Sequence, residues 1–194
     1  GALFFPLGIQ ATKGTSASCF CWDHISPLAK GDYKFQKLCR DYGFNKTDKY
    51  VVLTKSALSY YSDRYPNHRD KLIQIYNPAI ETSETTKSNC ESKRIVSVGR
   101  LCDQKNFSTL IDVARIVLTK HPDWFWDIFG QGELRDRLSE EIEDARLRDR
   151  VVLKGQVSNL LERYNEYSFM VMTSKYEGFP MTLLEGAASK VIGK

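Results

Sequence analysis

Residues 95–134 read IVSVGRLCDQKNFSTLIDVARIVLTKHPDWFWDIFGQGEL. The stretch opens with the short β-branched run Ile95–Val98, which predicts a strand. From Phe107 to Lys120 apolar residues recur at a spacing of about 3.6 residues, which predicts an amphipathic helix. Trp124–Phe129 predicts the next strand, and a glycine-rich turn follows it. A strand, a helix and a second strand in this order predict a parallel βαβ unit.

The same alternation continues toward the end of the chain. Two strands are expected at Val151–Leu153 and Phe169–Met172, and three helices at Glu133–Arg146, Asn159–Tyr167 and Met181–Ser189. Val191-Ile192 resembles the beginning of a further strand. Strands and helices that alternate in this way favour an α/β fold with a doubly wound parallel sheet.

The amino-terminal part is also α/β, but less regular. Strands are expected at Ala17–Trp22, Tyr50–Leu53 and Lys71–Tyr76, and helices at Phe35–Tyr42 and Ser56–Tyr65. The polar segment 81–92, ETSETTKSNCES, has no aliphatic side chain and predicts a linker. We therefore expect two Rossmann-like domains, over 1–85 and 86–194. Two complete domains of this kind need about 300 residues, so we expect both to be incomplete and the chain to be cut at both ends.

Composition excludes several classes of protein. The net charge of +4 is spread along the chain, without the concentrated basic face that nucleic-acid binding usually needs. Five cysteines without a CxxC pair argue against a zinc site or a disulfide framework, and favour a reduced, cytoplasmic setting. Cys19 and Cys21 alternate along an expected strand, which predicts two buried small hydrophobes. No stretch approaches the ~20 apolar residues of a membrane span.

Two loops that follow expected strands have features of phosphate-binding loops. Arg100 and Lys105 place two cations before a helix, where they suit a diphosphate; two solvated surface charges are the alternative. Gly130-Gln131-Gly132 lacks the third small residue of a dinucleotide fingerprint, because position 135 is Arg135. We interpret this GxG pair as a tight turn with close backbone approach.

The third loop, residues 173–185, reads TSKYEGFPMTLLE and carries two carboxylates eight residues apart. Glu177 precedes a Gly/Pro turn, and Glu185 lies in the first turns of a helix. Carboxylates accept pairs of hydrogen bonds and so suit sugar and ribose hydroxyls. An exposed loop carboxylate is the alternative for Glu177. For Glu185 the alternative is a capping box with Thr182.

The order VGRLCDQKN, GQGEL, SKYEGFPMTLLE resembles glycosyltransferase family 4, which has the GT-B fold, and the last segment matches that family's EX7E motif. The resemblance implies a retaining enzyme that moves a hexose from a nucleotide diphosphate sugar to a glycan or lipid-linked saccharide. It places the acceptor side in 1–85 and the donor-binding domain in 86–194. No metal or other cofactor is expected. Members of the family often act at the inner membrane face, so peripheral contact there stays open for a cytoplasmic protein.

The resemblance also assigns roles to single residues. Arg100 and Lys105 would bind the donor diphosphate, and Glu185 the ribose of the nucleotide. Glu177 would hold hydroxyls of the donor sugar, assisted by backbone amides. These amides would lie around Gly178, Phe179 and Pro180. The base would lie near Gly155-Gln156-Val157.

Cys21-Trp22-Asp23-His24-Ile25 resembles the segment where the family places a histidine that faces the donor sugar. Asp23 stands where the family often has glutamate, and a purely structural His24 stays open. Two other classes of protein remain: a non-catalytic nucleotide-sugar-binding fragment and a GT-B nucleotide-sugar epimerase. We expect this chain alone to transfer sugar weakly or not at all.

Overall fold

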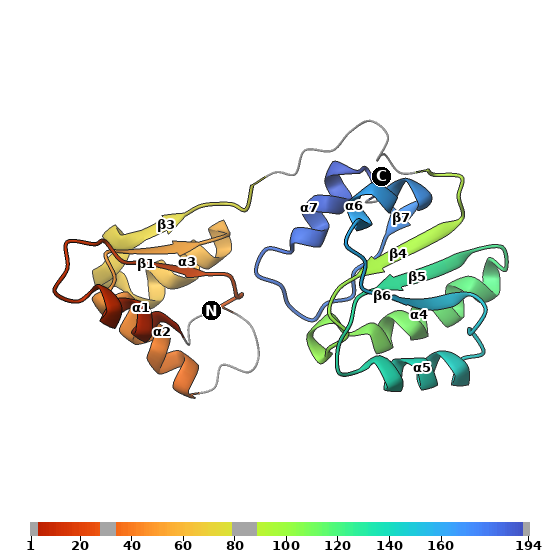
Figure 1. Cartoon of the computed structure of the whole chain (residues 1–194), viewed down its shortest axis with the longest axis horizontal. Helices are drawn as coiled ribbons and strands as arrows, with labels where there is room; N and C mark the ends of the chain where they lie inside the picture. Colours follow the sequence, from red (N-terminus) through yellow and green to blue (C-terminus); the bar gives the residue numbers. More distant parts are fainter. Residues whose placement is uncertain (1–3, 28–33, 79–88, 192–194) are drawn as a thin grey trace. The chain divides into compact units, whose positions relative to one another are not determined.

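A computed structural model describes residues 4–27, 34–78 and 89–191. The chain forms two compact units (Figure 1). The first contains Gly1–Pro78 together with Tyr176–Phe179, and the second contains Ala79–Lys175 and Pro180–Lys194. Most of the expected linker lies outside the described residues, as does Ile192. Among the helices that the structure describes, none is long and apolar enough to cross a membrane.

The first unit is built on a parallel sheet in the order β1-β2-β3. Its strands are β1 (Phe20–Asp23), β2 (Lys49–Val52) and β3 (Leu72–Gln74), and its helices are α1 (Phe5–Thr12), α2 (Lys34–Lys46) and α3 (Lys55–Arg64), with a 3-10 segment at Pro66–Lys71. Thr54 caps the start of α3, where its hydroxyl accepts a hydrogen bond from the amide of Ala57 at 3.1 Å. The helices pack on the sheet face that carries Cys21, Tyr50 and Val52.

All five cysteines are free thiols. Cys21 points into the core of the first unit, and burial raises the pKa of its thiol to about 11. Cys19 precedes β1 and is only half-buried. The prediction of two buried cysteines is therefore right for Cys21 and wrong for Cys19, because pairing with β2 begins one residue later, at Phe20.

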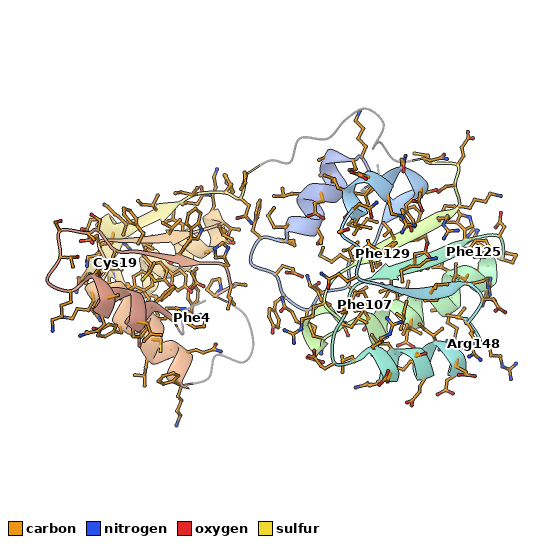
Figure 2. The ribbon with its side chains drawn as sticks, in the orientation of Figure 1. Phe4, Cys19, Phe107, Phe125, Phe129 and Arg148 are labelled. Atoms are coloured by element: carbon orange, nitrogen blue, oxygen red, sulfur yellow. The ribbon has the colours of Figure 1, made fainter. Side chains whose placement is uncertain are left out.

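The second unit is a doubly wound α/β domain whose parallel strands lie in the order β6-β5-β4-β7. The strands are β4 (Arg94–Val98), β5 (Phe125–Phe129, Figure 2), β6 (Val151–Gly155) and β7 (Phe169–Met170). The helices are α4 (Phe107–Lys120), α5 (Arg135–Asp144), α6 (Leu160–Arg163) and α7 (Met181–Ala188), with 3-10 helices η4 (Asp103–Lys105) and η5 (Tyr164–Glu166). Figure 1 shows α4 and α5 on one face of this sheet and α6 and α7 on the other.

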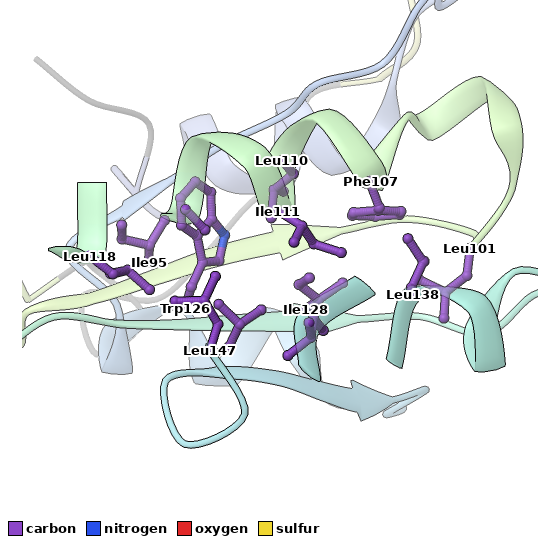
Figure 3. Packing of buried hydrophobic residues seen from close by; sticks show 13 residues of the cluster. Ile95, Leu101, Phe107, Leu110, Ile111, Leu118, Trp126, Ile128, Leu138 and Leu147 are labelled. Carbon is purple, nitrogen blue, oxygen red and sulfur yellow. The ribbon is translucent and has the colours of Figure 1, made fainter. Parts of the chain in front are cut away.

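The core of the second unit follows the periodicity of its sequence. Figure 3 shows Leu110, Ile111 and Leu118 of α4 against Trp126 and Ile128 of β5, all of them buried. The buried indole N–H of Trp126 donates to the Ser97 hydroxyl at 3.0 Å, so it is not left unsatisfied.

The order of the strands identifies where ligands bind in such a sheet. The chain adds β5 and β6 on one side of β4 and then returns to add β7 on the other side. The strand order therefore reverses between β4 and β7. In open α/β sheets, ligands bind at the carboxyl ends of the strands beside such a switch point.

Candidate functional site

The loops after β4 and β7 meet at the switch point of the second unit. The Thr173 hydroxyl is 3.1 Å from the carbonyl oxygens of both Lys105 and Asn106. The amide of Lys175 donates to the carbonyl of Gln104 at 2.9 Å. The first and third sequence motifs, about 70 residues apart in the chain, therefore form one edge of this domain.

The loop after β5 joins the same edge through backbone contacts. The amide of Leu101 donates to the carbonyl of Gln131 at 2.9 Å. A Cβ added at Gly130 would lie 1.8 Å from the carbonyl oxygen of Gly99, and one at Gly132 would lie 2.3 Å from that of Leu101. The interpretation of the GxG pair as a close backbone approach is confirmed, and its neighbour is the loop that carries Arg100.

Lys105 lies across the glycine at the start of its own loop. A Cβ at Gly99 would stand 3.1 Å from Cδ and Cε of the Lys105 side chain. The lysine is half-buried at the end of η4. It is therefore a side chain held in place along its aliphatic stem, rather than a fully solvated surface charge.

Arg100 lines an open pocket of about 530 Å³ together with Gly130, Gln131, Gly132 and Gln156. Its side chain is largely exposed, and its guanidinium lies 3.2 Å from the carboxylate of Glu133 in an ion pair. The pKa of Glu133 is lowered, chiefly by a hydrogen bond from its own backbone amide and further by the charge of Arg100. The Glu133 carboxylate is thus ionised at neutral pH, and it forms an ion pair with the guanidinium that the sequence predicts to bind phosphate.

Glu185 lies on α7, one turn inside the helix. The residue that caps the start of α7 is Pro180, which has no side-chain cap, and Thr182 lies inside the helix. The buried Thr182 hydroxyl has no hydrogen-bond partner within the described part of the chain. The capping-box alternative is therefore wrong. Glu185 instead accepts a hydrogen bond on Oε2 from the hydroxyl of Tyr164 at 3.3 Å.

The remaining predicted residues, His24, Glu177, Gly178 and Phe179, belong to the first unit. His24 follows β1, is exposed, and stacks on Trp22 with ring centroids 5.8 Å apart. A Cβ at Gly178 would lie 2.0 Å from the carbonyl oxygen of His24, so these two backbones touch. Glu177 and Gly178 also line a pocket of about 380 Å³.

Phe179 and Pro180, around which amide donors are expected, make different hydrogen bonds. The Phe179 carbonyl accepts a hydrogen bond from the side chain of Asn77 at 3.1 Å, which holds this residue in the first unit. Proline has no backbone N–H, so Pro180 cannot donate to a ligand, and its carbonyl instead accepts from the amide of Leu183 at 3.1 Å. Any amide donor in this part of the loop must therefore come from the neighbours of Pro180.

Asp23 is a residue whose importance the sequence does not reveal. It is buried, and its Oδ2 accepts hydrogen bonds from the hydroxyls of Tyr50 and Tyr61 and from Nε of Arg40, at 3.0, 2.9 and 3.2 Å. Its Oδ1 accepts from the amide of Ile25 at 3.2 Å. Burial, and then the charge of Asp23, raise the pKa of both tyrosines, which keeps them protonated as donors. Asp23 thereby fixes the turn that carries His24.

Comparison with known proteins places these features in a family. The family model for glycosyl transferases group 1 matches residues 80–192, more than half of the chain. An uncharacterised glycosyltransferase of Haemophilus influenzae is 26% identical over 167 residues, which are 86% of this chain and 47% of that protein. The amylovoran biosynthesis glycosyltransferase AmsD of Erwinia amylovora is 28% identical over 171 residues, or 85% and 47% of the two chains. This chain thus spans about half the length of these curated relatives.

Solved structures agree on the fold. The S. aureus protein TarM, crystallised with fondaparinux, α-GlcNAc-glycerol and UDP, superposes with a TM-score of 0.83 at 24% identity, over 98% of this chain and 38% of that one. The two α/β units with parallel sheets match the GT-B architecture of such enzymes. The family match and this architecture together show that the chain belongs to the glycosyl transferases group 1, with the GT-B fold.

Proposed function

We propose that the protein is a retaining glycosyltransferase that moves a hexose from a UDP-sugar to a glycan or lipid-linked saccharide. The observation that carries this proposal is the meeting of the loops after β4 and β7 at the switch point of the second unit, tied by Thr173. This meeting sets Lys105 and the start of α7 on one edge of the domain. The UDP in the TarM crystal supports uridine as the base.

The donor diphosphate has cationic partners at this edge. Arg100 and Lys105 would neutralise it and stabilise the negative charge that builds on the leaving group during transfer. The first backbone amides of a helix, here those of Met181 and Thr182, have no preceding helical carbonyl to pair with and favour an anion. Glu185 would bind the ribose, and the pocket beside Gln156 would take the base.

In this proposal residues 1–85 supply the acceptor side, and residues 86–194 form the donor-binding domain. Glu177, Gly178 and Phe179 would contact the donor sugar, and His24 would face it. The acceptor hydroxyl would attack on the face from which the diphosphate departs, which retains the anomeric configuration. The two cations supply the charge that a metal ion would otherwise bring, so we propose metal-independent transfer. A cytoplasmic location with peripheral contact at the inner membrane face is part of the same proposal.

Calorimetric titration with UDP and with GDP tests the donor site. We expect UDP to bind, and Lys105→Ala and Glu185→Ala each to weaken binding about tenfold, which corresponds to about 1.4 kcal/mol. Lys120→Ala is the matched control, because this exposed lysine ends α4 away from the three loops. Failure of the folded chain to bind either nucleotide, or equal affinity in all variants, would contradict the proposed donor site.

The chemistry is tested separately in a transfer reaction run with EDTA. NMR of the product reports the anomeric configuration of the transferred sugar. An α-linked product from an α-linked donor, formed at an undiminished rate, is expected. A β-linked product would rule out retention, and a rate abolished by EDTA would rule out metal independence.

A further inference from the structure

Tyr164 is a buried tyrosine whose hydroxyl lies against the candidate site. It begins η5, and its side chain is fully buried in a cluster with Val96, Phe129 and Tyr167. The hydroxyl is 3.3 Å from Oε2 of Glu185 on α7. Tyr164 therefore links the core of the second unit to the carboxylate that is proposed to bind ribose.

The electrostatics of this pair keep the tyrosine as the donor. Burial raises the pKa of the Tyr164 hydroxyl, and the negative charge of Glu185 raises it further. The hydroxyl is thus protonated throughout the physiological range and donates to the carboxylate. A carboxylate offers about four lone-pair positions, so one donor on Oε2 fixes its orientation and leaves capacity for a ligand.

The ring and the hydroxyl of Tyr164 have different tasks. The ring packs in the core, in the same cluster against which Val157 of the expected base segment packs. The hydroxyl acts on a flexible glutamate, whose rotamers cost free energy to order when a ligand binds. Ordering Glu185 in advance removes part of that cost.

We propose that Tyr164 is a positioning residue, which holds Glu185 in the orientation that accepts hydrogen bonds from the 2′- and 3′-hydroxyls of a nucleotide ribose. This inference rests on the proposed function, in which Glu185 binds the ribose. It adds a residue that does not itself touch the nucleotide and acts only through the carboxylate.

Tyr164→Phe removes the hydroxyl and keeps the ring. We expect this variant to bind UDP about fivefold more weakly, because Glu185 loses its fixed partner. Tyr167→Phe is the matched control: Tyr167 is equally buried in the same cluster and donates to a different carboxylate, Asp127, at 2.9 Å. The control should change UDP affinity less than about twofold, even if it lowers the stability of the protein. Urea unfolding of both variants measures their change in the free energy of unfolding.

A ligand without ribose hydroxyls separates positioning from a general loss of structure. With 2′,3′-dideoxy-UDP, Tyr164→Phe and wild type should bind alike. In a Glu185→Ala background, Tyr164→Phe should have no further effect on UDP, since coupled residues are not additive. Equal losses for UDP and the dideoxy ligand would overturn the inference, because the hydroxyl would then act on the fold as a whole.

The same experiment tells the failure of this inference from that of the proposed function. If Glu185→Ala weakens UDP binding and Tyr164→Phe does not, positioning by Tyr164 is wrong and the ribose role of Glu185 stands. If Glu185→Ala leaves UDP binding unchanged, the ribose role is wrong and the inference fails with it.

Discussion

Gly130 is the residue where substitution should most directly disturb the meeting of the loops after β4 and β5. Its φ is +143°, and a Cβ there would lie 1.8 Å from the carbonyl oxygen of Gly99. Real Cβ contacts are essentially never shorter than 3.0 Å, so the two backbones must separate by at least 1.2 Å, the difference between these distances. Gly155 also has a positive φ, +75°, but an added Cβ would meet no atom within 4 Å.

The two glycines therefore form a matched pair that separates steric clash from backbone strain. Gly155→Ala should cost only the left-handed conformation, about 1 to 2 kcal/mol. Gly130→Ala should also break backbone hydrogen bonds of this turn, such as that from its own amide to the carbonyl of Gly155 at 2.8 Å. Each such bond contributes about 1 kcal/mol. We expect a total of about 4 kcal/mol for Gly130→Ala, at least 2 kcal/mol more than for Gly155→Ala.

Urea denaturation followed by tryptophan fluorescence measures this difference. Trp124 and Trp126 both lie in the second unit, so a Trp22→Phe background makes the signal specific for that unit. The midpoint should fall further for Gly130→Ala than for Gly155→Ala at an unchanged slope. Equal midpoints would refute the reasoning, since backbone strain alone would then account for both variants.

Three further predictions follow from buried and paired charges. Glu133→Gln should strengthen UDP binding about threefold in calorimetry, because Arg100 loses a competing anion; weaker binding would contradict this. Asp23→Asn should lower the free energy of unfolding by about 3 kcal/mol in urea, because buried Arg40 loses its counterion; a change below about 1 kcal/mol would not fit. The Cys21 pKa is raised from 9.0 to about 11 by burial, so the unfolded thiol ionises first. The free energy of unfolding should therefore fall by about 2 kcal/mol between about pH 9 and 11, because the thiol ionises more readily in the unfolded chain. Urea unfolding over this pH range should show a smaller fall for Cys21→Ala.

Elements with a clear apolar stripe could be predicted from the sequence. Helix α4 begins and ends at the predicted residues, Phe107 and Lys120, because its apolar positions at helical spacing are those that pack in the core. Helix α1 was missed. It carries Pro6 and Gly8 and is apolar on more than one side, with Phe5 buried and Leu7 exposed, so no periodicity marks it. The expected helix over 159–167 is divided between α6 and η5.

The candidate site was predictable only as far as its motifs are local. The sequence indicated Arg100, Lys105 and Glu185, since each lies beside a glycine-rich turn or a helix start. It could not reveal that Glu133 pairs with Arg100, 33 residues away, or that Tyr164 pairs with Glu185, 21 residues away. Such pairs depend on strand order, which a hydrophobic pattern does not specify. The Asp23 hydrogen-bond network was missed for the same reason.

Hydrogen–deuterium exchange with and without UDP tests the location of the donor site most directly. The account predicts that UDP slows exchange in peptides that cover 99–106, 130–133, 155–157 and 181–185, which are the loops after β4 and β5, the base segment and the start of α7. Peptides from β6 and α5 away from the edge should exchange as before. Slowed exchange confined to other segments, while UDP binds, would show that the carboxyl edge of β4, β5 and β7 is not where the nucleotide is held.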